Sequence, residues 1–131
     1  MGDTMLINTP ISLGELLDKI SILLIKKENI KDKSKSRLIN NELKFLEQTL
    51  TKTKNNTKVQ KYLKQLININ SKLWVIEDTI REFESKKKFD KEFIKVARSV
   101  YKNNDKRAKI KLNINKAFGS KLIEVKSYKK Y

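Results

Sequence analysis

The sequence predicts an all-α protein, a single antiparallel bundle of about five helices built on one long central helix at about residues 57–84. Three observations predict this fold. Apolar side chains recur every seven residues between Val59 and Phe83, which places them on one stripe of one helix and calls for a partner helix. The segments on both sides also carry apolar residues at helical spacing. Neither an internal repeat nor a Gly/Pro/Ser-rich linker divides the 131 residues, so one domain, 1–131, is expected. The seven-residue stripe comprises Val59, Tyr62, Leu66, Ile69, Leu73, Ile76, Ile80 and Phe83.

A first helix is expected at about residues 11–30, after Pro10 and Ser12. Its main apolar face comprises Leu13, Leu16, Leu17, Ile20, Leu23, Leu24 and Ile30. Ile22 and Ile25 lie on the opposite side, so two faces of this helix should be covered. That pattern is typical of a helix in the middle of a bundle or at a contact between subunits.

A second helix is expected at about residues 36–50, after a charged loop at 31–36. Its apolar positions are Ile39, Leu43, Leu46 and Leu50. A turn at 51–56 follows, and Thr57 can cap the long third helix. Short links of this kind favour antiparallel neighbours.

After a break at residues 85–88, Asp90 can cap a fourth helix, with Phe89 packing on Ile94 as a hydrophobic staple. This helix should run to about Lys102. The polar residues 103–105 are expected to end it and to cap a fifth helix, which stops at Phe118 because Gly119 favours a left-handed C-terminal conformation. Residues 121–131 show no clear periodicity and read as an extended tail.

Composition excludes several classes of function. The chain has no cysteine and no histidine, which removes disulfides, thiol nucleophiles, imidazole bases and nearly all zinc sites. Its longest apolar run, residues 22–25, is far shorter than a membrane span, and residues 1–10 do not resemble a signal peptide. The expected location is therefore cytoplasmic.

The net charge of +16 is concentrated in the C-terminal third, where residues 91–131 carry 13 basic and 3 acidic side chains. Such a charge permits nucleic-acid binding by counterion release. However, lysine outnumbers arginine 27 to 4, which is typical of an A+T-rich genome, and regularly spaced aromatic side chains for base stacking are absent. A solvated basic face is the favoured interpretation of the lysines.

The strongest candidate site surrounds the expected junction of the last two helices. There Arg98, Lys102 and Arg107 would converge on the start of a fifth helix at Asn104 and Asp105. A helix start carries partial positive charge, and arginine forks bind phosphate or carboxylate in bidentate fashion. The alternative is that both arginines pair with Asp105 and only stabilise the turn.

A supporting polar face is expected on the third helix. Trp74, Glu77, Asp78 and Arg81 stand at helical spacing beside the apolar stripe, and with Tyr101 they could form a network that meets Arg98. The alternative is a simple Glu77–Arg81 ion pair with Trp74 in the core.

Glu15 and Asp18, three residues apart on the first helix, suggest a weak alternative. Paired acids on helices hold Mg²⁺ in all-helical nucleotide pyrophosphohydrolases. Those enzymes need a second acidic pair on another helix; Glu42 and Glu47 have the wrong spacing, and Glu77 and Asp78 are adjacent, so their side chains diverge on a helix. No other metal or cofactor is expected.

Four sequence segments carry a family resemblance: the stretch Ala97–Asp105 followed by Arg107 and Ala108, residues 73–78, residues 12–20, and the ending Gly119-Ser120-Lys121-Leu122 with Lys126-Ser127-Tyr128. Together they resemble a family of small bacterial and phage proteins classed as a domain of unknown function. The resemblance spans nearly the whole chain and implies a helical fold without an assigned activity.

These observations favour a non-enzymatic binding or adaptor protein that recognises an anionic group on a ligand or an acidic partner protein. A small Mg²⁺-dependent enzyme acting on a nucleotide or phosphorylated substrate is the first alternative, and general nucleic-acid binding is the second. Self-association is also expected, through surplus apolar faces of the first and third helices.

Overall fold

The computed structural model describes residues 4–53 and 56–131, and within them the chain forms four α-helices and no strand. The helices are α1 (Leu13–Asn29), α2 (Lys33–Thr53), α3 (Thr57–Ser85) and α4 (Lys91–Ala117). The all-α class is therefore confirmed, with four helices in place of about five. None of these four helices has both the length and the apolar content that crossing a membrane requires.

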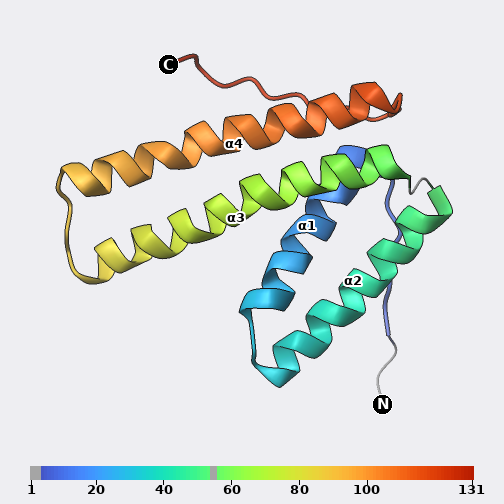
Figure 1. Ribbon diagram of the computed structural model, residues 1–131, viewed down its shortest axis with the longest axis horizontal. Helices are drawn as coiled ribbons and strands as arrows, with labels where there is room; N and C mark the ends of the chain where they lie inside the picture. The colour runs from blue at the N-terminus through green and yellow to red at the C-terminus, as the bar shows by residue number, and fades with distance from the viewer. Residues whose placement is uncertain (1–3, 54–55) are drawn as a thin grey trace.

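The helices form two antiparallel hairpins, α1–α2 and α3–α4 (Figure 1). The α1–α2 hairpin packs on one end of the longer α3–α4 hairpin, whose other end projects beyond it. Residues 121–131 have no regular secondary structure and run back beside α4, exposed to solvent. The core lies where the two hairpins meet. Its most buried apolar side chains are Leu17, Ile20, Val59, Leu66 and Ile114.

Helix α1 is the hub of this arrangement, because it contacts α2, α3 and α4. Its second apolar face is covered within the chain, with Ile25 buried and Ile22 partly buried. Of the two explanations for a doubly apolar first helix, the structure supports a place in the middle of the bundle. The first helix therefore offers no surplus apolar face for self-association.

The predicted break at residues 103–105 is wrong, because α4 runs without interruption from Lys91 to Ala117. Asn and Asp are good caps, but this preference is weak beside the packing of α4 on α3. The side chain of Asn103 turns back on its own helix, and its Nδ2 donates to the Ser99 carbonyl at 2.7 Å. No helix starts at Asp105, so the partial positive charge expected there is absent.

Most of the other predicted helix ends are confirmed. Ser12 caps α1 by accepting the amide of Glu15 at 3.1 Å, and Asp90 caps α4 by accepting the amides of Glu92 and Phe93. Gly119 adopts a left-handed φ of 62° directly after α4. The hydrophobic staple differs from the prediction, since the ring of Phe89 packs edge-on against Phe93, with centroids 5.2 Å apart, and the expected partner Ile94 is 54% exposed.

Two boundaries differ by a few residues. Helix α2 begins at Lys33 because Asp32 accepts the amide of Lys35 at 2.9 Å, a cap that the sequence interpretation missed. Asn56, in place of Thr57, caps α3 by accepting the amide of Val59. The expected turn at 51–56 is shorter, since residues 51–53 are helical, and its residues 54 and 55 lie outside the described residues.

The seven-residue stripe of α3 does meet partner helices, but unevenly along its length. Val59, Leu66, Ile69 and Leu73 are buried against α1 and α4. From Ile76 to Phe83 its side chains are only partly buried, in the part of α3 that runs beside α4 and extends beyond α1. The hydrophobic core therefore ends near Leu73.

Candidate functional site

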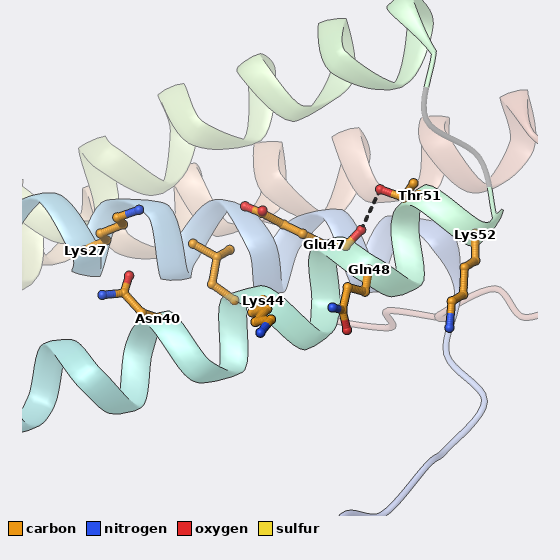
Figure 2. Close-up of a pocket in the computed structure, with 8 residues that line it drawn as sticks. Lys27, Asn40, Lys44, Glu47, Gln48, Thr51 and Lys52 are labelled. Atoms are coloured by element: carbon orange, nitrogen blue, oxygen red, sulfur yellow. Dashed lines mark hydrogen bonds between the residues drawn. The ribbon is translucent and has the colours of Figure 1, made fainter.

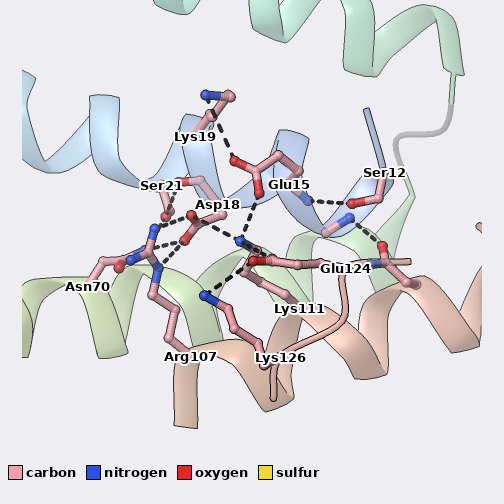
Figure 3. A network of polar contacts seen from close by, with 12 residues as sticks. Ser12, Glu15, Asp18, Lys19, Ser21, Asn70, Arg107, Lys111, Glu124 and Lys126 are labelled. Atoms are coloured by element: carbon pink, nitrogen blue, oxygen red, sulfur yellow. Dashed lines mark hydrogen bonds and ion pairs between the residues drawn. The ribbon is translucent and has the colours of Figure 1, made fainter. Parts of the chain in front are cut away.

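A buried carboxylate lies where α1 crosses α3 and α4 (Figure 3). Asp18 on α1 is only 1% exposed. Arg107 on α4 donates to both of its oxygens, from Nε to Oδ1 at 2.9 Å and from Nη2 to Oδ2. Asn70 on α3 donates to the same Oδ1 at 2.9 Å and to the hydroxyl of Ser21 at 2.7 Å. One side chain of α1 thus joins three helices, with every hydrogen bond charge-assisted or buried.

Lys111, one turn further along α4, extends this network to the C-terminal segment. Its Nζ lies 2.8 Å from Glu15, 3.0 Å from Glu124 and 3.9 Å from the Asp18 carboxylate. Glu124 also pairs with Lys126 at 3.2 Å. These contacts hold the extended segment 121–131 against α4 (Figure 3).

The charges of this network stabilise one another. Burial alone would raise the pKa of Asp18, but hydrogen bonds from Arg107 and Asn70 and the nearby cations outweigh it, so that pKa lies below its ordinary value. Burial alone would lower the pKa of Lys111, yet hydrogen bonds to Glu15 and Glu124 raise it. The hydrogen bond to Asp18 raises the pKa of Arg107. All three groups are therefore ionised at neutral pH.

A glycine allows α1 and α4 to approach closely enough for these contacts. The amide of Gly14 donates to Oδ1 of Asn115 at 2.8 Å. A Cβ atom at position 14 would lie 2.7 Å from the Lys111 carbonyl oxygen and 2.9 Å from the Asn115 side chain. Only a residue without a side chain fits between the two helices at this point.

Two clefts open on either side of Arg107. The first, of about 470 Å³, lies between α1, α3 and α4. The second, of about 770 Å³, lies between α4 and the C-terminal segment. Asn104 and Arg107 line both clefts. The first is lined by Ile22, Ile25, Lys26, Asn70, Leu73, Trp74, Glu77, Asp78, Arg81, Asn104 and Arg107. The second is lined by Val100, Tyr101, Asn104, Asp105, Arg107, Ala108, Lys111, Lys126, Tyr128, Lys129 and Tyr131.

The structure divides the predicted anion-binding residues. Asn104, Asp105 and Arg107 line the second cleft, which we call the C-terminal cleft, whereas Arg98 and Lys102 do not. In one continuous helix, residues nine apart differ by two and a half turns, so Arg98 and Arg107 lie on opposite sides of α4. The expected convergence of the two arginines is therefore wrong.

The expected alternative, in which both arginines pair with Asp105, does not hold for either residue. Arg107 pairs with Asp18, and the Nε of Arg98 donates to the Tyr101 hydroxyl at 3.3 Å. Asp105 instead accepts a hydrogen bond from Tyr131, which raises the pKa of that tyrosine. The rings of Tyr101 and Tyr131 meet edge-on with centroids 5.0 Å apart.

The supporting set on α3 lies along the first cleft. Trp74, Glu77, Asp78 and Arg81 all line it together with Asn104 and Arg107. Glu77 and Arg81 form the expected exposed pair, 3.6 Å apart. Trp74 is partly buried at the cleft wall, and Arg98 contacts Tyr101 on its own helix.

The paired acids Glu15 and Asp18 do not fit a Mg²⁺ ion. Their carboxylates are occupied by the cations of Lys111 and Arg107, which would repel a divalent metal. Across the described part of the chain, no three Asp or Glu side chains gather closely enough to hold a metal.

A further hollow lies over α1 and α2 (Figure 2). It is lined by Lys27, Asn40, Leu43, Lys44, Glu47, Gln48, Thr51 and Lys52. Except for Leu43 these side chains are exposed, and Thr51 donates to the Glu47 carbonyl of its own helix at 3.0 Å. This hollow has no buried polar group that could fix a ligand.

Sequence reasoning missed several residues of the network, namely Ser21, Asn70, Lys111, Asn115 and Glu124. Asn70 offered a signal, because it is a polar residue beside the apolar positions Leu66, Ile69 and Leu73 of α3. Lys111 offered none, since it is one of 27 lysines and only the tertiary structure distinguishes it.

Comparison with protein families gives a match over nearly the whole chain. Residues 7–131 match a family model described as "Family of unknown function (DUF6165)". No curated protein and no solved structure matches the chain.

Proposed function

Since the chain belongs to this family of unknown function, we propose its function from the site alone: a binding protein that receives an anionic group, phosphate or carboxylate, in the C-terminal cleft. The observation that carries the proposal is the set of cationic donors on the cleft wall. Arg107, Lys111, Lys126 and Lys129 line it together with Asp105. Asp18, Glu15 and Glu124 pair with the first three of these cations from behind the wall, so an anion would meet Lys129 and the N–H donors that those pairs leave unused.

Arg107 supplies the directional part of the site. Its Nε and Nη2 are fixed by Asp18, which holds the guanidinium plane in one orientation. A guanidinium has five N–H donors, and the remaining ones have no acceptor among the described residues. The side chain is 28% exposed, so these donors are available to a ligand oxygen. An arginine preorganised in this way loses little conformational entropy on binding.

The C-terminal segment supplies cations that a ligand can recruit. Lys126 shares Glu124 with Lys111 and lies 5.7 Å from the Tyr128 ring, whereas Lys129 has no acid partner among the described residues. Tyr101, Tyr128 and Tyr131 add ring surface and hydroxyl donors around these charges. The wall therefore suits an anionic group attached to a larger body, such as a phosphorylated ligand or an acidic segment of a partner protein.

Isothermal titration with inorganic phosphate, pyrophosphate and succinate tests the proposal. The variant Lys126→Gln/Lys129→Gln should bind about tenfold more weakly, because two charge-assisted contacts are removed. The matched control Lys33→Gln/Lys35→Gln removes the same charge from exposed positions of α2, and its affinity should stay within about twofold.

Four results count against the proposal. Equal losses in the two variants would mean that only net charge matters. Steeply salt-dependent binding of single-stranded DNA that both variants weaken alike would favour general nucleic-acid binding. Hydrolysis of a nucleotide with Mg²⁺ would favour the enzyme alternative. An absence of heat with every anion would also remove the proposal.

A further inference from the structure

The far end of the α3–α4 hairpin is apolar but uncovered. We call residues 74–85 of α3 and 91–102 of α4 the projecting half, because they extend beyond α1, which reaches only the start of this half at the first cleft, while α2 packs on α1 (Figure 1). Eleven of its 24 residues are apolar, yet none is buried. In the covered end of α3, by contrast, Val59, Leu63 and Leu66 are buried.

Some of these apolar side chains are largely solvent-exposed. Val75 is 62% exposed and Ile94 is 54% exposed, and Phe89 beside the connecting turn is 54% exposed. Others, such as Phe83 and Val96, are partly buried, and the Phe83 ring meets Phe93 of α4 and Lys88 of the connecting turn. Two helices alone cannot enclose a stripe of this width, and four-helix bundles solve the problem by adding a second hairpin.

The two helices of the projecting half have opposite charge. Residues 74–85 carry four acids (Glu77, Asp78, Glu82 and Glu84) and one base (Arg81), a net charge of −3. Residues 91–102 carry four bases (Lys91, Lys95, Arg98 and Lys102) and one acid (Glu92), a net charge of +3. The surface is therefore self-complementary, since an acidic and a basic helix can each face their opposite in an identical copy.

We propose that the projecting half binds the projecting half of a second copy of this chain, with α3 of each copy against α4 of the other. This arrangement covers the exposed apolar stripe and pairs unlike charges on both sides of a two-fold axis. Packing of α3 against α3 would instead bring net charges of −3 together. The projecting half reaches the C-terminal cleft at Val100 and Tyr101, but the residues changed in the tests below lie outside that cleft, so the proposal can be tested separately from the proposed anion binding.

Sedimentation equilibrium of the full chain between about 1 and 200 µM tests the proposal. The native chain is expected to form a species of twice its 15.4 kDa mass. The variants Glu77→Lys/Glu84→Lys and Lys91→Glu/Arg98→Glu each make the two helices of one copy alike in charge. The dimer of each variant alone should therefore dissociate, because its dimerisation affinity is reduced at least about tenfold.

An equimolar mixture of the two variants provides the decisive arm. In the mixture, every acidic helix can again face a basic helix, so a mixed dimer with one copy of each variant should form. The control Lys33→Glu/Lys35→Glu changes the same amount of charge on exposed positions of α2 and should leave the dimer intact. Unchanged far-ultraviolet circular dichroism verifies that each variant is folded.

Three outcomes overturn the proposal. The first is a native chain that remains at 15.4 kDa throughout the concentration range, which is also the result expected if a different protein covers this surface. The dimer could survive both charge reversals. The two variants could dissociate separately and fail to recover a dimer when mixed.

A variant with Ile94→Glu, at a position 54% exposed and therefore tolerant of a charge, should also dissociate without unfolding.

Discussion

At the scale of single residues, the main feature of the structure is the ionised carboxylate of Asp18, which lies in the protein interior, where a charge is energetically unfavourable. Moving a carboxylate out of water costs several kcal/mol, and an ion pair recovers that cost only when its hydrogen bonds are satisfied. Asp18 meets this condition through Arg107 and Asn70. No buried side-chain nitrogen or oxygen of the described residues lacks a partner. Because the acceptor lies on α1 and its donors lie on α3 and α4, the network fixes how these helices are aligned.

The substitution Asp18→Asn should reveal this coupling through pH. A carboxyl whose pKa is lowered on folding stabilises the protein above its unfolded pKa of about 3.8, and this stability is lost as the pH falls through the lower folded value. At pH 7 the variant should lose about 3 kcal/mol of unfolding free energy, near the low end of the usual range because Arg107 reaches solvent. Urea denaturation from about pH 7 to pH 3 measures the difference.

The gap between the native chain and Asp18→Asn should narrow as the pH falls. Asp32 and Glu82 also have lowered pKa values, but they lie outside this network and contribute equally in both proteins, so the difference reports on Asp18 and the groups coupled to it. A gap that stays constant down to pH 3 would mean that Asp18 is not the ionised partner of Arg107.

At the scale of the helices, local signals compete with packing, and the outcome depends on what the helix lies against. Ser12, Asp90 and Gly119 stand at exposed helix ends, where a cap has no competitor. The sequence at 103–105 has similar capping chemistry but lies in the middle of α4, where α3 and α1 pack alongside. There the capping preference, about 1 kcal/mol, is too small to interrupt the helix.

The contact of α1 with α4 should depend on Gly14. Replacing Gly14 by Ala forces the backbone of Lys111 and the side chain of Asn115 apart, since a Cβ cannot approach a carbonyl oxygen to 2.7 Å. We expect a loss of about 1–3 kcal/mol in unfolding free energy, as for an overpacked core. Thermal or urea denaturation provides the measurement.

Gly119→Ala is the matched comparison. Its φ of 62° strains an alanine, but no atom lies within 4 Å of the added Cβ. The loss of unfolding free energy should therefore stay near the roughly 1–2 kcal/mol that an alanine costs in a left-handed backbone conformation. If Gly14→Ala were as stable as the native chain, the close approach of α1 and α4 would be wrong.

At the scale of the whole molecule, the chain consists of a packed end and a projecting end. Helices α1 and α2 and the covered half of α3–α4 share one core. The projecting half is a hairpin of two helices whose apolar side chains are partly exposed (Figure 1). Local opening requires less free energy where fewer apolar groups are buried. The two ends should therefore differ in stability within one native structure.

Amide hydrogen exchange should show this difference. In dilute monomer, amides of α3 around Leu66 should exchange only by global unfolding, and those around Ile80 should exchange at least about tenfold faster. Amides of residues 103–105 should be protected like the rest of α4, since the helix is continuous there. Uniform protection along α3, or fast exchange confined to residues 103–105, would contradict this description.

Local patterns along the chain were sufficient to predict the helical class, the long α3 and most helix ends, because periodicity and capping act over a few neighbouring residues. Three features follow only from the packing of the helices: α4 continues past Asp105, Arg107 faces Asp18 while Arg98 faces away, and Lys111 is buried whereas most lysines are exposed. These features join residues about ninety positions apart. They depend on which helix faces lie together in space, and that information is not contained in any local pattern.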